Sequence, residues 1–332
     1  MTTTSHFDVE RHGGRVPMLA VEYGHNPVRW AEQHRQSLRM AVAERGAVLV
    51  RGLGLRDPAE VADTFQRLVP GGLMPDREAF AARQPYLDGV YSSLNWPANQ
   101  PMCMHHELSY ALEFPGLMLF ACLQAPGTGG ATGVADARAV LDAIPQAILE
   151  RFENEGWLLA RSYNQYIGAS YEEAFGVGDR TAVEEYCHTH AIEFQWQPDG
   201  ELHTRQRRPA VVRHPLTGER CWFNQIAFLS EWTIAPEVRE YLLDVYGPDG
   251  LPFNTRFGNS EPISEDIIAL LNEVYEAHTL RTPWEPGDLM LVDNISMAHS
   301  REAYAGHREI LVGMAEPRNV FHLETHAQNG AR

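Results

Sequence analysis

The chain has 332 residues, of which 44 are acidic and 27 are basic, and its formal net charge is −17. Its hydrophobic fraction of 44% and charged fraction of 21% are typical of a globular protein, and a chain of this length can bury a large core without disulfides. The negative charge argues against nucleic acid as a partner, because nucleic-acid binders need a positive field to displace counterions from phosphates.

Several helices and strands are predicted in the first part of the chain. Residues 27–45 carry apolar side chains at helical spacing, and residues 57–69 predict a second helix that begins with an aspartate cap. Between them, residues 47–53 predict a short buried strand. Residues 89–94 predict another strand, within a stretch rich in Pro and Gly. The apolar run at 115–126 is bounded by prolines and predicts a central strand.

The second part of the chain predicts a mixture of helices and strands without regular alternation. Residues 136–156 predict a helix that a proline breaks into two pieces. A strand pair is expected within 208–228, and 264–280 is the clearest amphipathic helix. Residues 288–294 and 308–316 predict two strands separated by a loop of about a dozen residues, a long connection of the kind that often carries function.

These elements favour a mostly β fold with flanking helices, an α+β protein built on an antiparallel sandwich or jelly roll. No GxGxxG motif follows a strand, so a Rossmann sheet is not expected. No repeat or linker divides the chain. We therefore expect a single domain over 1–332, with N-terminal helices and a helical and strand insertion at about 145–265.

The basic residues and the cysteines exclude further classes. All the basic residues are Arg, which removes Schiff-base chemistry, a lysine base and the P-loop lysine. The four cysteines form no CxxC pair, so no zinc ribbon or thioredoxin-like motif is expected. Residues 1–14 contain no apolar stretch typical of a signal peptide, and no apolar run approaches the ~18 residues that span a membrane. A cytoplasmic protein with reduced thiols and no membrane partner is the expectation.

The segment MCMHHELSYA carries the most informative pattern. His105 and Glu107 are two residues apart, so in a strand their side chains would project to the same face. His299, in the predicted loop after residue 294, is the candidate third ligand. Two histidines and one carboxylate on one face of an octahedron leave three positions open, as in the facial triad of non-haem Fe(II) oxygenases. With 15 histidines in the chain, an HxE pair alone is weak evidence.

Two further residues strengthen this pattern. An oxo acid that chelates iron at one end needs a cation for its distal carboxylate, and Arg offers a bidentate fork. Arg308 lies at the start of a predicted strand, and Thr132, in the predicted GGAT turn, offers a hydroxyl donor beside it. Arg301 competes for this role. Arg308 is preferred because a strand residue is better positioned than a loop residue.

Together these motifs resemble the taurine dioxygenase and clavaminate synthase group of Fe(II)/2-oxoglutarate-dependent oxygenases, and most closely its amino-acid hydroxylase branch in natural-product pathways. The resemblance extends through GAVLVRGL, MHHELSYALEFPGLMLF, GGATGVADARAVLDAIP, CWFNQ and WEPGDLMLVDNISMAHSREAYAGHR. It implies a double-stranded β-helix (jelly-roll) core. It also implies that His105, Glu107 and His299 hold Fe(II), and that Thr132 and Arg308 bind 2-oxoglutarate.

The resemblance also implies a reaction. With O₂ and 2-oxoglutarate, an unactivated C–H bond of an amino acid or amino-acid-derived metabolite is hydroxylated, and succinate and CO₂ are released. The substrate is a small molecule, free or tethered to a peptidyl carrier protein. Related halogenases carry a small residue where this chain has Glu107, so hydroxylation is favoured over halogenation. Desaturation and cyclisation stay open, as do a zinc-dependent hydrolase and a non-catalytic metal-binding module.

Three other features of the sequence also lead to predictions. His106 is expected to lie outside the ligand set, and Trp284 is expected to be a core residue. The basic run at 205–208 predicts a solvated face, or a surface that meets an acidic substrate or an acidic carrier protein. The sequence leaves the oligomeric state open.

Overall fold

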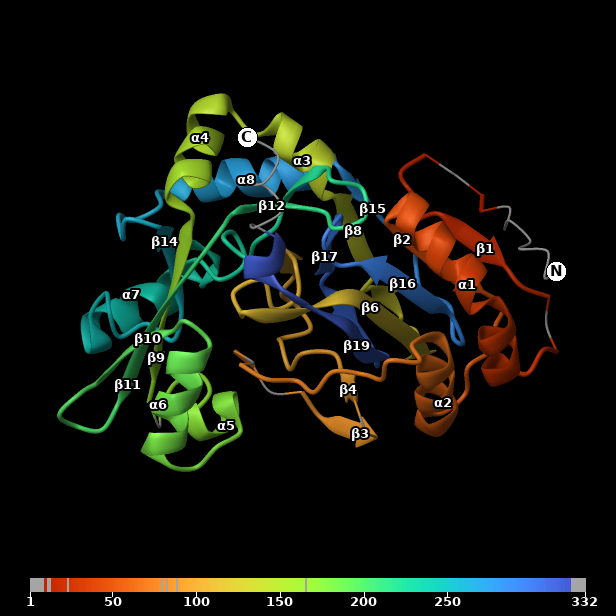
Figure 1. Cartoon of the computed structure of the whole chain (residues 1–332), viewed down its shortest axis with the longest axis horizontal. Coiled ribbons are helices and arrows are strands. Elements are labelled where there is room, and N and C mark those ends of the chain that lie inside the picture. Colours follow the sequence, from red (N-terminus) through yellow and green to blue (C-terminus); the bar gives the residue numbers. More distant parts are fainter. Residues whose placement is uncertain are drawn as a thin grey trace.

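The computed structural model describes residues 9–10, 13–22, 24–78, 80–81, 83–87, 89–164 and 166–323. Most of residues 1–14, where the sequence predicts no signal peptide, lie outside these ranges. The described chain is mostly β, with helices on the outside of the sheets, as the sequence predicts (Figure 1). Within these ranges, every helix is too short or too polar to cross a membrane.

Two sheets form the centre of the molecule. The larger has the strand order β1-β2-β16-β6-β19-β4-β3 and the smaller has the order β15-β8-β17-β5. The larger sheet contains β1 (Met18–Ala20), β2 (Ala47–Arg51), β3 (Pro85–Leu87), β4 (Val90–Ser92), β6 (Glu113–Gln124), β16 (Leu289–Asp293) and β19 (Glu309–Asn319). The smaller sheet contains β5 (Met102–His105), β8 (Thr132–Asp136), β15 (Thr279–Leu280) and β17 (Met297–Arg301). Neighbouring strands in both sheets are antiparallel, except for the parallel pair β1 and β2.

The helices agree well with the periodicity of the sequence. They are α1 (Pro27–Arg45), α2 (Pro58–Leu68), α3 (Ala137–Ala143), α4 (Gln146–Glu155), α5 (Tyr171–Phe175), α6 (Arg180–Thr189), the 3₁₀ turn η1 (Glu231–Thr233), α7 (Pro236–Tyr246) and α8 (Glu265–Ala277). Asp57 caps α2 by accepting a hydrogen bond from the backbone N–H of Glu60. The proline at 145 separates α3 from α4, because it cannot continue the helix.

Strand β6 shows how the sequence builds layers. Side chains alternate along a strand, so Leu117 and Leu119 pack with α1 and α2, while Met118 and Phe120 join the core on the opposite face. The ring of Phe120 lies 5.3 Å from the ring of His299, which belongs to the smaller sheet. The two sheets therefore face each other, and His299 lies between them.

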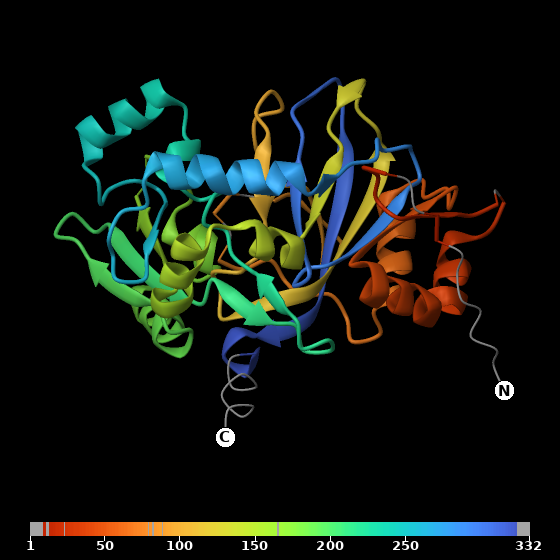
Figure 2. The ribbon, with the colours of Figure 1, turned by 90° about the horizontal axis from the view of Figure 1, so that it is seen from above.

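A third sheet lies at the opposite end of the molecule from α1 and α2 (Figures 1 and 2). Its strands are β10 (Glu193–Trp196), β11 (Leu202–Arg208), β9 (Trp157–Tyr163) and β14 (Asn254–Phe257), in that order. The remaining strands form two pairs, β12 (Val211–Arg213) with β13 (Arg220–Trp222) and β7 (Thr128–Gly129) with β18 (Tyr304–Ala305). The third sheet packs against α5 and α6 around a small core of its own.

The basic run at 205–208 lies on β11, and the alternation of that strand divides it. Arg205 and Arg207 are exposed, in agreement with a solvated face. Arg208 is buried and donates to the carbonyl groups of His190 and Ala191, so including it in the solvated face was wrong. Side chains on opposite faces of one strand meet different environments even when they are chemically identical.

The predicted loop between 294 and 308 was also wrong. It contains β17, whose five residues Met297–Arg301 are all buried, and the short strand β18. Strand prediction depends on apolar alternation, and β17 presents polar side chains to the space between the sheets. His299 is therefore held by a strand in the middle of the smaller sheet.

Candidate metal site and anion pocket

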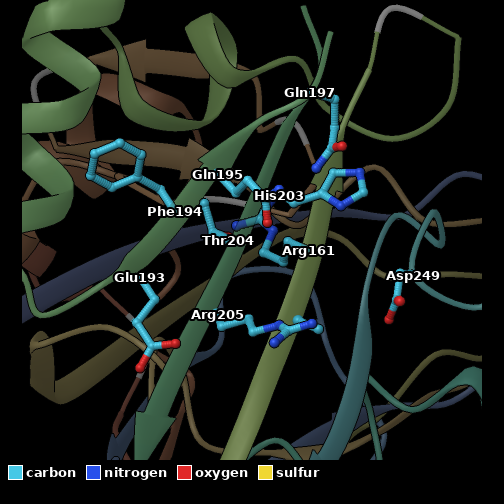
Figure 3. Close-up of a pocket in the computed structure, with 10 residues that line it drawn as sticks. Arg161, Glu193, Phe194, Gln195, Gln197, His203, Thr204, Arg205 and Asp249 are labelled. Atoms are coloured by element: carbon cyan, nitrogen blue, oxygen red, sulfur yellow. The ribbon is translucent and has the colours of Figure 1, made fainter. Parts of the chain in front are cut away.

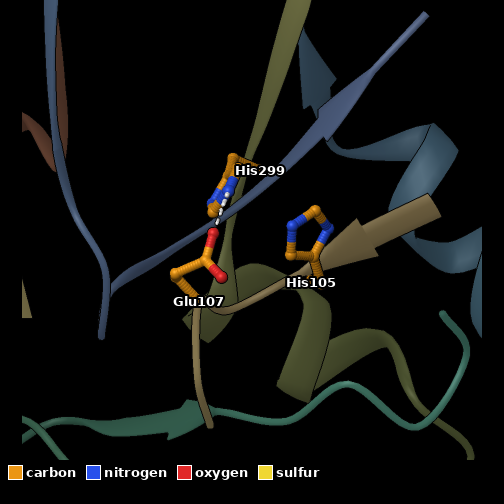
Figure 4. Close-up of side chains that lie close together, drawn as sticks. All are labelled: His105, Glu107 and His299. Atoms are coloured by element: carbon orange, nitrogen blue, oxygen red, sulfur yellow. Dashed lines mark ion pairs between the residues drawn. The ribbon is translucent and has the colours of Figure 1, made fainter. Parts of the chain in front are cut away.

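The structure brings His105, Glu107 and His299 together. Strand β17 pairs with β5 so that His299 lies opposite His105, and their ring centroids are 4.3 Å apart. The Nε2 atom of His299 lies 3.7 Å from Oε2 of Glu107 (Figure 4). One ligand atom from each residue lies within 4.8 Å of the others, and all three residues are buried. Among the described residues, this is the cluster able to hold a metal ion.

Glu107 reaches this cluster from a turn, because β5 ends at His105. The same-face argument for a strand therefore does not explain its position. The side chain of Asn294 does: its Oδ1 accepts from the N–H of Glu107 at 2.8 Å, and its Nδ2 donates to the carbonyl groups of Glu107 and Pro115. Gln225 also donates to the carbonyl group of His106. The backbone of Glu107 is thus fixed from both sides by one amide.

His106 lies outside the cluster, as the sequence suggests. It is fully buried, its Nδ1 lies 2.6 Å from the carbonyl oxygen of Asn294, and its ring packs against Phe223. Burial lowers the pKa of His106 to about 4. The side chain helps to join the 106–109 turn to the turn between β16 and β17.

Asn294→Ala should strongly destabilise the protein. The substitution removes three hydrogen bonds and leaves the buried N–H and C=O of Glu107 without these partners, so we expect a loss of about 3 kcal/mol in the free energy of unfolding. Urea denaturation would measure it. Asn259→Ala, which removes an exposed turn contact, is the matched control. A change below about 0.5 kcal/mol for Asn294→Ala would show that the amide is not what fixes the turn.

The protonation states of the cluster suit a cation. Burial would raise the pKa of Glu107, but Arg83, His299 and His105 together hold it well below its usual range. Burial and then His299 lower the pKa of His105 to about 3. Nδ1 of His105 lies 2.8 Å from the carbonyl oxygen of Cys103, which can only accept, so Nδ1 carries the proton and Nε2 keeps a free lone pair. A neutral imidazole and an ionised carboxylate are the forms that bind metal.

The rings of the two histidines are held by aromatic contacts. Phe228 stacks on His105 with ring centroids 4.6 Å apart, and Phe120 meets His299 edge-on. These contacts restrict both imidazoles before any ligand arrives. Two imidazoles and one carboxylate, buried and preorganised, form a donor set that fits Fe(II).

An anion-binding arrangement lies in the same cavity. Arg308 donates through Nε to the carbonyl oxygen of Gly130 at 3.0 Å, and its terminal nitrogen lies 3.4 Å from Oγ1 of Thr132. The indole N–H of Trp284 donates to the same hydroxyl at 3.2 Å. Burial and then Arg301 lower the pKa of Arg308 to about 10, so the guanidinium is still charged at neutral pH. Thr132 and Arg308 line the cavity that also contains the three clustered residues.

Two details of this arrangement correct the sequence analysis. Thr132 is the first residue of β8 and does not lie in the preceding turn. Arg301 belongs to a strand and Arg308 directly precedes one, so the stated reason for preferring Arg308 was wrong. The contacts supply a better reason: Arg301 donates to the carbonyl groups of Trp96, Pro97 and Gln100, whereas Arg308 points at Thr132.

Sequence reasoning missed Arg83, Asn294 and the role of Trp284. Arg83 donates to Oε2 of Glu107 at 2.8 Å and lines the cavity, but it lies in a stretch without periodicity. Asn294 carried a detectable signal, since it directly follows the buried strand β16. The indole of Trp284 could not be distinguished by pattern from any other core tryptophan.

A second cavity, of about 330 Å³, lies on the third sheet (Figure 3), and its lining includes none of the three clustered residues. Its lining includes Arg161, His203 and Arg205, together with the acidic residues Glu193 and Asp249. Side chains of both signs of charge therefore line this cavity.

Several known proteins are similar to this chain. Residues 19–315 match the family described as taurine catabolism dioxygenase TauD, TfdA family. The dapdiamide synthesis protein DdaC of Enterobacter agglomerans is 31% identical over 276 residues, which cover 83% of this chain and 84% of that protein. A clavaminate synthase-like protein of Arabidopsis thaliana is 24% identical, with 91% and 90% covered.

Solved structures share the fold. PvcB from Pseudomonas aeruginosa superimposes with a TM-score of 0.55 at 16% identity, covering 95% of this chain and 92% of that one. A taurine dioxygenase from Burkholderia xenovorans gives a TM-score of 0.52 at 15% identity, with the same coverage. A second structure of PvcB, described as an Fe, alpha-ketoglutarate dependent oxygenase from an isonitrile synthetic pathway, gives 0.52 at 17% identity, again covering 95% and 92%.

Proposed function

The chain belongs to the taurine catabolism dioxygenase TauD, TfdA family, and from this premise we propose that it hydroxylates an unactivated C–H bond of an amino acid or amino-acid-derived metabolite. Enzymes of this family are dioxygenases that use Fe(II), 2-oxoglutarate and O₂, and this chain is one of them. The zinc-dependent hydrolase and the non-catalytic binding module that the residues alone left open are set aside on that ground.

One observation carries the assignment of residues: a buried cluster of two imidazoles and a carboxylate shares a cavity with a buried guanidinium and a hydroxyl. We assign His105, Glu107 and His299 as the ligands of Fe(II). We assign Thr132 and Arg308 to the distal carboxylate of 2-oxoglutarate, because a guanidinium beside a hydroxyl gives charge and direction to that contact.

When bound, Fe(II) and 2-oxoglutarate supply the oxidising chemistry that uses O₂ to replace C–H by C–OH, with succinate and CO₂ as co-products. The protein contributes position and environment. His105 presents Nε2 because Cys103 fixes its tautomer, and Glu107 stays ionised because Arg83 and His299 stabilise its charge. The apolar side chains of Phe120 and Ile310 line the same cavity and limit the access of water.

Thr132 is arranged to donate. Its oxygen accepts from Trp284 and lies within reach of Arg308, so its own hydrogen is left for a carboxylate in the cavity.

Trp284→Phe removes the indole N–H and keeps most of the packing. We expect the KM for 2-oxoglutarate to rise about fivefold with little change in kcat, because one hydrogen bond of about 1 kcal/mol is lost. Steady-state succinate release would measure it, with Trp232→Phe as a control outside the cavity. An unchanged KM would refute this role for Trp284.

The substrate is inferred from the relatives. One relative is named for dapdiamide synthesis, and one similar structure comes from an isonitrile synthetic pathway. Both support a role in natural-product biosynthesis. For a tethered substrate we propose a peptidyl carrier protein as partner, with the exposed cations Arg205 and Arg207 on β11 as its contact.

The carboxylate of Glu107 favours hydroxylation over halogenation, and desaturation or cyclisation are the other outcomes that product analysis would reveal.

The proposal extends to the fold and location. We propose that the two facing sheets form a double-stranded β-helix (jelly roll) within a single domain over 1–332. The strands of the third sheet, between residues 157 and 257, support an insertion at about 145–265. The four cysteines are unpaired, which supports a location in the cytoplasm.

The test is an anaerobic titration of the Fe(II)-loaded protein with 2-oxoglutarate, followed by a panel of amino acids. We expect a visible charge-transfer band when 2-oxoglutarate binds and a shift of that band with an amino acid of the right class. Admission of O₂ should then release succinate. Absence of the band, or turnover without 2-oxoglutarate, would overturn the proposal.

A further inference from the structure

Arg83 is a buried cation whose assigned role so far is to keep Glu107 ionised. Its side chain is 4% exposed, one terminal nitrogen donates to Oε2 of Glu107 at 2.8 Å, and Nε lies 3.5 Å from Oδ2 of Asp76. Burial of a guanidinium is expensive unless its partners compensate for the lost hydration. A buried arginine placed against an assigned metal ligand therefore calls for a reason beyond packing.

The segment that carries Arg83 is anchored at a distance from the cluster. Residues 74–84 contain no helix or strand among their described positions, yet Glu78 within them is 2% exposed. The carboxylate of Glu78 accepts hydrogen bonds from Tyr186 and Gln206, and its carbonyl oxygen accepts from Tyr110. Glu78 also has a φ of 56°, in the left-handed region, which persists only where the surroundings fix it. Glu78, five residues before Arg83, is therefore held in place by the third sheet and α6.

The two oxygens of Glu107 have different surroundings. Oε2 accepts from Arg83 and lies 3.7 Å from Nε2 of His299, while the second oxygen lies on the side of His105 (Figure 4). The carboxylate thus faces both imidazoles and could bind a cation through one oxygen or through both. Binding through both would occupy a position that a facial triad leaves open for the oxo acid or O₂.

We propose that Arg83 is a positioning residue that reserves Oε2 of Glu107, so that the carboxylate binds iron through one oxygen. The proposal rests on the proposed function, because it presumes an iron that needs three open positions. A charge-assisted hydrogen bond from a fixed guanidinium competes with the metal for one oxygen and leaves the other free. The carboxylate of Asp76, 3.5 Å from Nε, is a second charged partner of the guanidinium.

The competing explanation is that Arg83 only balances the charge of Glu107. Two variants separate these two explanations. Arg83→Gln keeps an N–H donor without the charge, and Arg83→Met keeps neither. Because Gln and Met lose the same charge, a difference between them measures the hydrogen bond alone. Arg239→Met removes an arginine paired with Glu231 outside the cavity and serves as the matched control.

The first measurement is the infrared difference spectrum on adding Mn(II) to the full-length protein. The splitting of the carboxylate stretches distinguishes one-oxygen from two-oxygen binding. We expect the one-oxygen pattern in the wild type and in Arg83→Gln, and the two-oxygen pattern in Arg83→Met. A two-oxygen pattern in the wild type would overturn the proposal even if no variant folds.

The second measurement is the affinity of the anaerobic Fe(II)-loaded proteins for 2-oxoglutarate, read from the charge-transfer band. We expect about a tenfold loss in Arg83→Met, because binding through both oxygens would occupy a position that the oxo acid needs, and less than about threefold in Arg83→Gln and in the control. Equal affinities in Arg83→Met and the wild type, or equal losses in Met and Gln, would overturn the proposal. A wild type that does not bind 2-oxoglutarate at all would instead refute the proposed function, and the Mn(II) spectrum would still decide the role of Arg83.

Discussion

Glu107→Ala is expected to reduce iron- and 2-oxoglutarate-dependent succinate release by about a thousandfold. The substitution removes the carboxylate from the three-donor cluster. A bound metal stabilises the transition state by several kcal/mol, and at about 1.4 kcal/mol per tenfold change in rate, losing that stabilisation gives a factor of this size. The measurement is succinate release at saturating Fe(II) and 2-oxoglutarate, with bound iron determined in parallel. Glu261→Ala, which removes an exposed carboxylate, is the control for loss of charge.

The same substitution should also destabilise the protein. It breaks the buried ion pair with Arg83, and removing one partner of such a pair typically costs about 3–5 kcal/mol. Asp76 still neutralises the guanidinium in part, which places the expected loss near the lower end of that range. Glu107→Gln keeps the shape and an acceptor for Arg83, so it should lose activity while retaining more stability. Succinate release by Glu107→Ala at the wild-type rate would show that the carboxylate is not a ligand.

The sequence predicted the cluster because two of its members are neighbours in the chain. His105 and Glu107 belong to one short motif. His299 was the candidate third ligand, and the resemblance then matched it to the distal histidine of the family. The helices were predictable for a similar reason, since α1, α2 and α8 each carry a regular apolar spacing and a terminal signal. Local patterns are sufficient where a structure depends on local contacts.

The remainder of the site depends on contacts that no local pattern contains. The N–H of Glu107 is held by Asn294, 187 residues away, and its carboxylate by Arg83 on an irregular segment. Strand β17 looked like a loop because its buried residues include a histidine and an arginine that face the cavity. A strand that presents polar groups to a binding site lacks the apolar alternation on which strand prediction relies.

The second large effect is expected for Arg308→Gln. The variant removes a buried cation from the proposed contact with the distal carboxylate, and truncating one partner of a buried charge pair costs about 2–5 kcal/mol. We expect the KM for 2-oxoglutarate to rise about a hundredfold, with a smaller change in kcat because the reacting end of the co-substrate binds at the metal. Arg308→Lys keeps the charge but loses the planar guanidinium with its paired N–H donors. We therefore expect it to bind 2-oxoglutarate about tenfold more tightly than Arg308→Gln does.

Arg301→Gln is the comparison that decides between the two arginines. Its guanidinium donates to the carbonyl groups of Trp96, Pro97 and Gln100, so its loss should loosen the 96–100 turn and lower the free energy of unfolding. The KM for 2-oxoglutarate should rise less than in Arg308→Gln, because the terminal nitrogens of Arg301 already donate to these three carbonyl groups. If Arg301→Gln instead raises that KM more than Arg308→Gln does, then Arg301 binds the distal carboxylate and Arg308 serves to hold Gly130 and Thr132.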